Sequence, residues 1–192
     1  MNKFKRIAVL LLLVIPFVFN SCKQNQEKDL IKIGAILPLT GDAAPWGKPP
    51  KKGAELAVKE INENGGINGK KIELIVEDDA CDPKKGVSAA NKMISSDKPI
   101  AIVGAICSGS TLAIAPIVEK EEVVLISPGS THPDITNAGD YIFRVVPSDA
   151  YRAKMFAEYI ANEGYETAGV LFVNNQPGKS AKDNFVKYFE QY

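Results

Sequence analysis

One short stretch of the chain places a cysteine among carboxylates. The segment VEDDACDPKKG, residues 76–86, contains Cys81 with Asp78, Asp79 and Asp82 around it. Residues of these types could ligate a metal ion, host a reactive thiol, or surround one half of a disulfide. A metal site needs more sulfur or nitrogen ligands than this segment offers, so we expect no metal here. Asp82, which precedes a proline, is typical of a helix N-cap.

Two hydroxyl-rich segments could also carry chemistry: CSGST at 107–111 and PGSTHP at 128–133. A nucleophile elbow needs a glycine two residues before and two residues after its serine, and neither Ser108 nor Ser130 has them. The one histidine, His132, stands in a loop, where a solvated side chain is the usual role, and the chain offers no second base for a catalytic triad. We therefore expect no enzymatic activity.

Neither glycine-containing segment near a predicted strand end matches a nucleotide-binding motif. GAILPLTG (34–41) lacks the G-x-G-x-x-G pattern. In NNQPGKS (174–180), the Gly-Lys-Ser at 178–180 fits the end of a P-loop, but Val173 stands where the first glycine is required. We expect a plain turn into a helix there, and no cofactor.

The hydroxyl-rich segments fit non-covalent binding better. Residues 108–111 open a predicted helix, and the backbone N–H groups of a helix N-terminus attract an anion. Residues 129–131 follow the next predicted strand. Together they could hold a small carboxylate through neutral hydrogen bonds, while a carbonyl and a hydroxyl accept from an ammonium group. The same residues fit plain caps and turns equally well, so both interpretations stay open at the level of the residues.

The elements that must position these segments alternate regularly from residue 30 onward. The expected strands span residues 30–37, 70–78, 98–106, 123–129, 141–146 and 167–173. The expected helices span residues 47–66, 82–97, 108–122, 149–166 and 178–192, with Pro49 and Pro50 in the first turn of the first helix. Apolar strands alternating with helices predict parallel βαβ units in a doubly wound α/β sheet, with strand order 2-1-3-4. Ligands bind such sheets beyond the carboxyl ends of the strands.

The N-terminus predicts export. Lys3, Lys5 and Arg6 precede a wholly apolar run at 7–19, which is typical of a signal peptide and short for a membrane span. A membrane anchor is the alternative. Ser21 and Cys22 resemble the lipobox of bacterial lipoproteins, in which the cysteine is lipidated; cleavage nearby, giving a soluble periplasmic protein, is the other possibility. Beyond Cys22 the chain has 20 basic and 23 acidic residues, interspersed, so nothing indicates nucleic-acid binding.

Several long segments together resemble one family. IKIGAILPLTGDAAPWG, GAELAVKEINENGGINGKKIELIVEDDACDP, GAICSGSTLAIAPI, LISPGSTHPDIT and YIFRVVPSD occur in this order, and they resemble the branched-chain amino-acid-binding proteins of bacterial ABC transporters. The resemblance covers about residues 30–192. It implies the type I periplasmic-binding-protein fold, in which ligand binds between two α/β lobes. It also implies a first lobe at 30–143, a hinge crossing at 144–149 and the incomplete beginning of a second lobe at 150–192. The N-terminal residues themselves predict the signal peptide at 1–22 and a polar tether at 23–29.

The resemblance also implies a set of site residues. Trp46 occupies the aromatic position of the first loop, Ile106 and Ser108 match the loop in which the serine holds the ligand carboxylate, and Gly129 and Thr131 supply backbone and a hydroxyl. Pro177 stands where an aromatic residue normally helps to close the cleft. A disulfide is implied between Cys81 and Cys107. Because their strands flank the first strand about 10 Å apart, and bridged Cα atoms lie within about 7 Å, the two loops must lean toward each other.

The function implied is that of an extracytoplasmic solute-binding lipoprotein. It would bind an amino acid or a similar small carboxylate and deliver it to an ABC permease. Cys22 would tether it through lipid at the periplasmic or cell surface, and it would be a monomer with no cofactor. A sensory receptor module with the same fold is the alternative.

Overall fold

A computed structural model describes residues 30–174 and 176–192, without the side chains of residues 176 and 177. The predicted signal peptide, Cys22 and the side chain of Pro177 therefore lie outside the described residues. Five strands form one sheet in the order β2-β1-β3-β4-β5. They are β1 (Leu30–Leu37), β2 (Lys71–Asp78), β3 (Ala101–Gly104), β4 (Val124–Ser127) and β5 (Ile142–Arg144). This parallel α/β sheet confirms the predicted fold class, and β3 pairs in register with β1 and β4.

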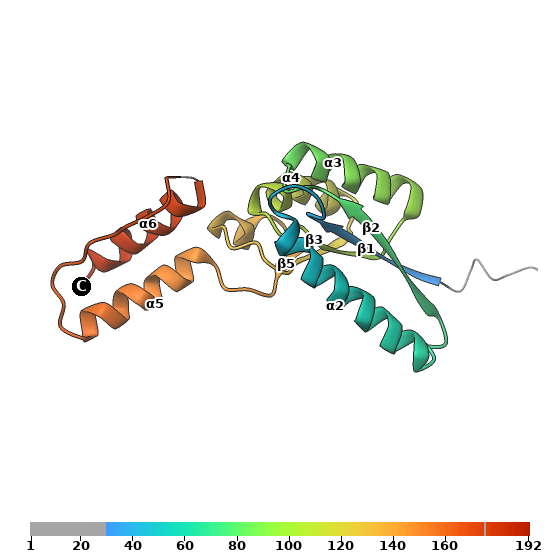
Figure 1. Cartoon of the computed structure of the whole chain (residues 1–192), viewed down its shortest axis with the longest axis horizontal. Helices are drawn as coiled ribbons and strands as arrows, with labels where there is room; N and C mark the ends of the chain where they lie inside the picture. Colours follow the sequence, from blue (N-terminus) through green and yellow to red (C-terminus); the bar gives the residue numbers. More distant parts are fainter. Residues whose placement is uncertain (1–29, 175) are drawn as a thin grey trace, which may run out of the picture. The chain divides into compact units, whose positions relative to one another are not determined.

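The helices of this region lie on the two sides of the sheet. Helix α2 (Ala44–Glu63) lies on one side, and α3 (Pro83–Lys92) and α4 (Ser108–Lys120) lie on the other (Figure 1). Helix α3 continues as a π-helical turn, η3 (Met93–Asp97), and a short 3-10 helix, η4 (Pro133–Asn137), follows β4. The main core is made by apolar side chains of β1, β3, β4 and β5 together with α3, α4 and η4. Its buried members include Ile36, Met93, Ile102, Ile114, Val118, Leu125 and Ile142.

Helix α2 begins one turn earlier than the sequence predicts. Pro49 and Pro50 lie inside the helix rather than in its first turn, so that prediction was wrong. The reason lies at Gly47, where a β-carbon would come within 1.9 Å of the carbonyl oxygen of Pro38. Since only glycine permits this approach, the first turn of α2 packs directly on the end of β1. The two prolines then remove backbone donors from a helix that tertiary contacts have already started.

The face of the sheet opposite α3 and α4 is partly open. Leu125 and Ile142 pair across β4 and β5 and point into the core, whereas the next pair along the strands, Ile126 and Phe143, points the other way. Ile126 is exposed, and half of Phe143 (51 %) is accessible. In the part of the chain that the structure describes, no helix buries this pair.

Residues 149–192 form two helices that pack on each other, α5 (Asp149–Asn162) and α6 (Gln176–Phe189). The rings of Phe156 and Phe185 lie 5.7 Å apart. The strand predicted at 167–173 does not form, because a strand needs a neighbour for its backbone N–H and C=O groups and the described residues 149–192 offer none. Its apolar residues are exposed instead, Leu171 completely. The Gly-Lys-Ser at 178–180 lies within α6 rather than in a turn before it.

Candidate ligand-binding site at the strand ends

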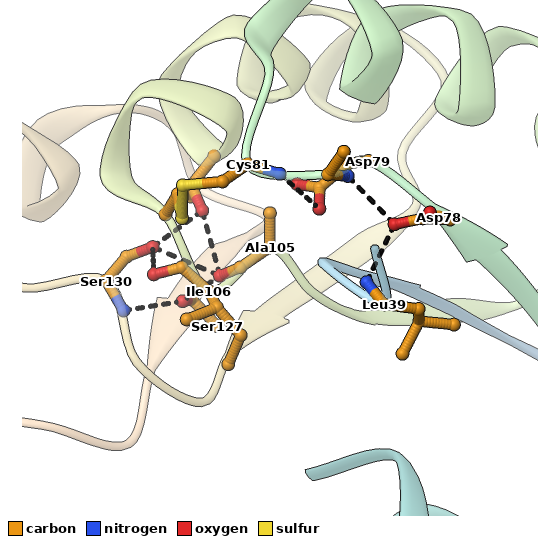
Figure 2. The surroundings of a disulfide bond; sticks show 11 residues. Leu39, Asp78, Asp79, Cys81, Ala105, Ile106, Ser127 and Ser130 are labelled. Carbon is orange, nitrogen blue, oxygen red and sulfur yellow. Dashed lines mark hydrogen bonds between the residues drawn. A yellow bond between two sulfur atoms is a disulfide. The ribbon is translucent and has the colours of Figure 1, made fainter. Parts of the chain in front are cut away.

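The loops that follow β2 and β3 are joined by a disulfide. Cys81 and Cys107 are bonded, with their Cα atoms 5.5 Å apart. Ala80 and Cys81 have left-handed backbone conformations, with φ of 47° and 62°, which turn the chain sharply after β2. The loop thereby leans over the end of β1 and reaches the residue that precedes α4 (Figure 2). The structure thus contains the disulfide that the family resemblance implies, and it shows how the spacing across β1 is overcome.

Asp78 connects the loop after β1 to the end of β2. Its Oδ1 accepts from the backbone N–H of Leu39 at 2.7 Å and of Ala80 at 2.9 Å, and its Oδ2 accepts from the hydroxyl of Thr40. Partial burial raises the pKa of Asp78, but the hydrogen bonds from Thr40, Leu39 and Ala80 outweigh it and hold the pKa below its ordinary value of 3.8. Asp78 is therefore an anchor for two loops.

Asp79 faces the opposite environment. Its side chain is fully buried, and its Oδ1 accepts from the N–H of Cys81 at 3.2 Å. Burial raises the pKa of Asp79 and the charge of Asp78 adds to the rise, while the N–H of Cys81 and the nearby Ser110 hydroxyl lower it. Asp79 Oδ2 and Ser110 Oγ reach no hydrogen-bond partner within the described residues. Asp82 is the predicted N-cap of α3 and accepts from the N–H groups of Lys84 and Lys85.

Buried hydroxyls fasten the loop after β3 to the loop after β4. The hydroxyls of Thr111, Ser127 and Ser130 all approach the carbonyl oxygen of Ala105, Thr111 and Ser130 at 3.1 Å (Figure 2). Ser130 Oγ also lies 3.1 Å from the carbonyl of Ile106 and 2.7 Å from Thr111 Oγ1. A carbonyl oxygen has two lone pairs, so the carbonyl of Ala105 can accept from two of these hydroxyls at a time. The hydroxyl of Ser130 has the carbonyl of Ile106 as another acceptor. Thr111 and Ser130 are fully buried and face inward.

The outer rim of the same two loops carries four of the expected site residues. A β-carbon on Gly129 would lie 3.3 Å from the side chain of Ile106, so the two residues lie close together. Ser108, the first residue of α4, accepts a hydrogen bond at 3.3 Å from the N–H of His132. Thr131 precedes His132 in the chain and is half-buried. The structure therefore brings these residues together at adjacent strand ends.

The fifth expected residue, Trp46, lies in the first turn of α2 rather than in the loop before it. Its side chain is 72 % exposed. It follows β1, which is the sheet neighbour of β3, so it belongs to the same edge of the sheet. No hydrogen bond or ring contact described for these residues joins it to Ser108 or Thr131.

Asp149 is a polar residue of this site that sequence reasoning missed. It is the first residue of α5, it is largely buried, and its Oδ2 accepts from Thr131 Oγ1 at 2.9 Å. Its Oδ1 pairs with the guanidinium of Arg152. A helix-start signature at Ser148 indicates the N-terminus of α5, but no local pattern predicts a contact with a residue 18 positions earlier.

The surroundings of His132, the acidic residues and the longer helices were also informative in the described part of the chain. His132 Nδ1 accepts from the N–H of Asp134 and caps η4. Among residues 30–174 and 176–192, no group of three or more histidine, cysteine or acidic side chains gathers to hold a metal. No helix in that part of the chain is both long and apolar enough to cross a membrane.

Comparison with known proteins gives the class of this fold and site. The sequence profile of the family described as periplasmic binding protein matches residues 30–192, and the chain belongs to that family. It is 38 % identical over 169 residues to the leucine-, isoleucine-, valine-, threonine-, and alanine-binding protein of Pseudomonas aeruginosa, which is 86 % of this chain and 45 % of that protein. It is 37 % identical over 149 residues to the leucine-specific-binding protein of Salmonella typhimurium, 77 % of this chain and 40 % of the relative.

Solved structures agree on the fold and differ in ligand. The branched-chain amino acid transporter substrate binding protein of Streptococcus pneumoniae, in complex with isoleucine, has a TM-score of 0.76 at 31 % identity, over 84 % of this chain and 47 % of that one. A solute binding protein of Rhodopseudomonas palustris, in complex with 3,4-dihydroxybenzoic acid, has a TM-score of 0.76 at 29 % identity, over 85 % and 45 %. This chain spans less than half the length of each of these four proteins.

Proposed function

We propose that this protein is the solute-binding component of an ABC transporter and that it binds an amino acid or a similar small carboxylate. The observation that carries the proposal is the geometry at Ser108. Its oxygen accepts from His132, and no hydrogen bond described for these residues uses its proton. Cys107, the N-cap of α4, makes no side-chain capping bond. Ser108 therefore combines a helix N-terminus with a hydroxyl donor that no described bond uses, which favours a carboxylate at this position.

The other expected residues complete this proposed site. Ile106 and Gly129 would supply apolar contact and backbone, Thr131 a hydroxyl, and Trp46 an aromatic cover from the neighbouring strand end. Residues 30–143 would be the first lobe, 144–149 a hinge crossing and 150–192 the beginning of a second lobe. A permease would read the closed, ligand-bound state.

We also propose how the protein is exported and anchored. The family is periplasmic, and the disulfide suits an oxidising compartment. We propose that residues 1–22 direct export and that Cys22 carries lipid and holds a monomeric protein at the membrane. The transport proteins among the relatives favour this function over a sensory module. Mass spectrometry of the membrane fraction tests the lipid anchor. It would find either diacylated Cys22, as we expect, or an unmodified terminus.

Isothermal titration calorimetry against the common amino acids and benzoate tests the binding function. We expect one class of ligand to bind, and Ser108→Ala to weaken it at least tenfold, since a charge-assisted hydrogen bond contributes about 1.5–3 kcal/mol. Ser95→Ala removes an exposed hydroxyl whose described hydrogen bond goes to the carbonyl of Lys92, and it should leave affinity unchanged. Binding of no compound in the panel would contradict the proposal.

A further inference from the structure

Two buried polar side chains beside the disulfide have unused hydrogen-bonding atoms. Asp79 follows β2, Ser110 lies in the first turn of α4, and both residues are fully buried. Asp79 Oδ1 accepts from the N–H of Cys81 at 3.2 Å, whereas Asp79 Oδ2 and Ser110 Oγ have no partner among the described residues. Because buried polar atoms are nearly always paired, this pair needs a physical explanation.

The pair lies at the N-terminus of α4, where the backbone donors are also unused. The N-cap residue Cys107 makes no side-chain capping bond, and no hydrogen bond described for α4 uses its first three backbone N–H groups. The disulfide ties Cys107 to Cys81, two residues after Asp79. The buried carboxyl therefore lies at the same positive helix end that the proposed ligand carboxylate would use.

We infer that Asp79 couples ligand binding to proton uptake: a carboxylate bound at Ser108 favours protonated Asp79, so that affinity rises as the pH falls. When Asp79 takes up a proton from water, its Oδ2 can donate to Ser110 Oγ, which pairs both unused atoms. When ionised, Asp79 is a second negative charge at the helix end and repels the ligand carboxylate. The inference rests on the proposed function and deepens it by adding a regulation of that site.

The surroundings of Asp79 give this coupling its direction. Burial raises the pKa of Asp79 above its ordinary value of 3.8 and outweighs the hydrogen bond from the N–H of Cys81, and the charge of Asp78 adds to the rise. From β1, the carbonyl of Leu37 accepts from the N–H of Asp79, and the disulfide carries no titrating group. A bound carboxylate would raise the pKa of Asp79 further, because proton and ligand each favour the other.

Other charged groups near the site lie beside different residues. On α3, the N–H groups of Lys84 and Lys85 donate to Asp82, whose charge both lysines stabilise. In the loop after β4, the N–H of His132 donates to Ser108. Since histidine side chains also change charge between pH 5 and 8, the test must separate His132 from Asp79.

Calorimetry with L-leucine between pH 8 and pH 4.5 tests the inference. The affinity of the full chain should rise by about fivefold toward low pH, and buffers of different ionisation enthalpy should reveal proton uptake. Asp79→Asn keeps an acceptor for Cys81 and a donor for Ser110, so it should bind leucine at pH 8 as tightly as the natural chain does at low pH, without proton uptake. Glu73→Gln, the same exchange at an exposed residue of β2, should behave like the natural chain.

NMR gives a second measurement that needs no ligand. The carboxyl carbon of Asp79, assigned by its loss in Asp79→Asn, should titrate with a midpoint above 3.8. The amides of Ser108 and Gly109 should follow that midpoint in the natural chain and not in Asp79→Asn.

The outcomes separate the inference from the proposed function. Leucine affinity without pH dependence, proton uptake retained in Asp79→Asn, or amides that do not follow Asp79 would overturn the inference and leave the proposed function standing. If leucine and the other amino acids all fail to bind, the proposed function fails and the inference with it.

Discussion

The sheet region (residues 30–144) and the helical region (residues 149–192) contain equally apolar strand-like segments with different fates. Residues 33–37 became part of β1, flanked by β2 and β3. Residues 170–173, Val-Leu-Phe-Val, have no neighbouring strand in the described chain and lie exposed. The difference shows that an apolar run becomes a strand only when another segment satisfies its backbone.

The helical region instead leaves an apolar groove of about 520 Å³ between α5, residues 168–172 and α6. Phe156, Phe172 and Phe185 line it, with Asp149 and Arg152 among its polar residues. In the sheet region, the comparable apolar volume is filled by the buried core around Ile102 and Leu125. The regions should therefore respond differently to the same side-chain truncation.

The largest expected effect is the contrast between two Leu→Ala substitutions. Leu125 is completely buried and Leu171 completely exposed. Leu125→Ala should lower the free energy of unfolding by about 3–4 kcal/mol through lost burial and a residual cavity. Leu171→Ala should change it by less than about 0.5 kcal/mol. Urea denaturation followed by circular dichroism measures both, and similar losses would mean that residue 171 packs against a partner in solution.

Removing the disulfide should have the next largest effect, again in the sheet region. Cys81 and Cys107 are separated by 26 residues, and a loop of that size stabilises by about 3.5 kcal/mol in the chain-entropy account. The double substitution Cys81→Ala with Cys107→Ala tests this loss of stability without leaving an unpaired thiol in the protein. Non-reducing peptide mapping of the natural chain should find the 81–107 linkage, and two free thiols in protein from an oxidising compartment would contradict it.

Adjacent aspartates should give opposite effects of pH. The pKa of Asp78 is depressed, so its stabilisation is present at neutral pH and is lost as the pH falls below 3.8. Asp78→Asn should lower the free energy of unfolding at pH 7 by roughly 1.5 kcal/mol and should make it depend less on pH in the acid range.

The pKa of Asp79 is raised, so its ionised form destabilises the fold at pH 7, and protonation relieves this as the pH falls. Asp79→Asn should raise stability at pH 7, by about 1 kcal/mol; shifts of the same sign in both variants would contradict the assignment.

The smallest effects concern two helix caps, one in each region. Asp82 caps α3, and Ser148 caps α5 by accepting from the N–H of Tyr151. Ser148→Ala should lower the free energy of unfolding by about 1 kcal/mol, and Asp82→Ala should lower it as well, because each change removes the acceptor that caps its helix. In hydrogen exchange, Asp82→Ala should speed the exchange of amides across the sheet region, whereas Ser148→Ala should speed only those of α5 and α6. Uniform acceleration by Ser148→Ala would show that the two regions unfold as one unit.

Most of the sheet region could be predicted from its sequence. The strands at 30–37 and 70–78 and the cap at Asp82 follow from local pattern. The early start of α2 could not be predicted, because it depends on the contact of Gly47 with Pro38 from another element. The strand predicted at 167–173 failed for the same kind of reason, since strand formation depends on a pairing partner that local sequence does not specify.

The candidate site was predictable as a set of loops but not as a set of contacts. Hydroxyl residues at two strand ends indicated where a ligand would lie, and Ile106, Ser108, Gly129 and Thr131 do gather there. Sequence could not separate Ser130, which is buried against Ala105, from Thr131, which faces Asp149. That division depends on which side chain points inward, and it is settled only by the packing of β4 against β3.

The hydroxyl network around Ala105 has a consequence for binding thermodynamics. Because Thr111, Ser127 and Ser130 hold the two loops together in this structure, little conformational entropy of the loops would remain to be lost when the proposed ligand binds. Binding of the proposed ligand at Ser108 and Thr131 should then show a small entropic penalty for loop ordering. Loosening the network should weaken affinity mainly through a faster dissociation rate, although none of the three hydroxyls needs to touch the ligand.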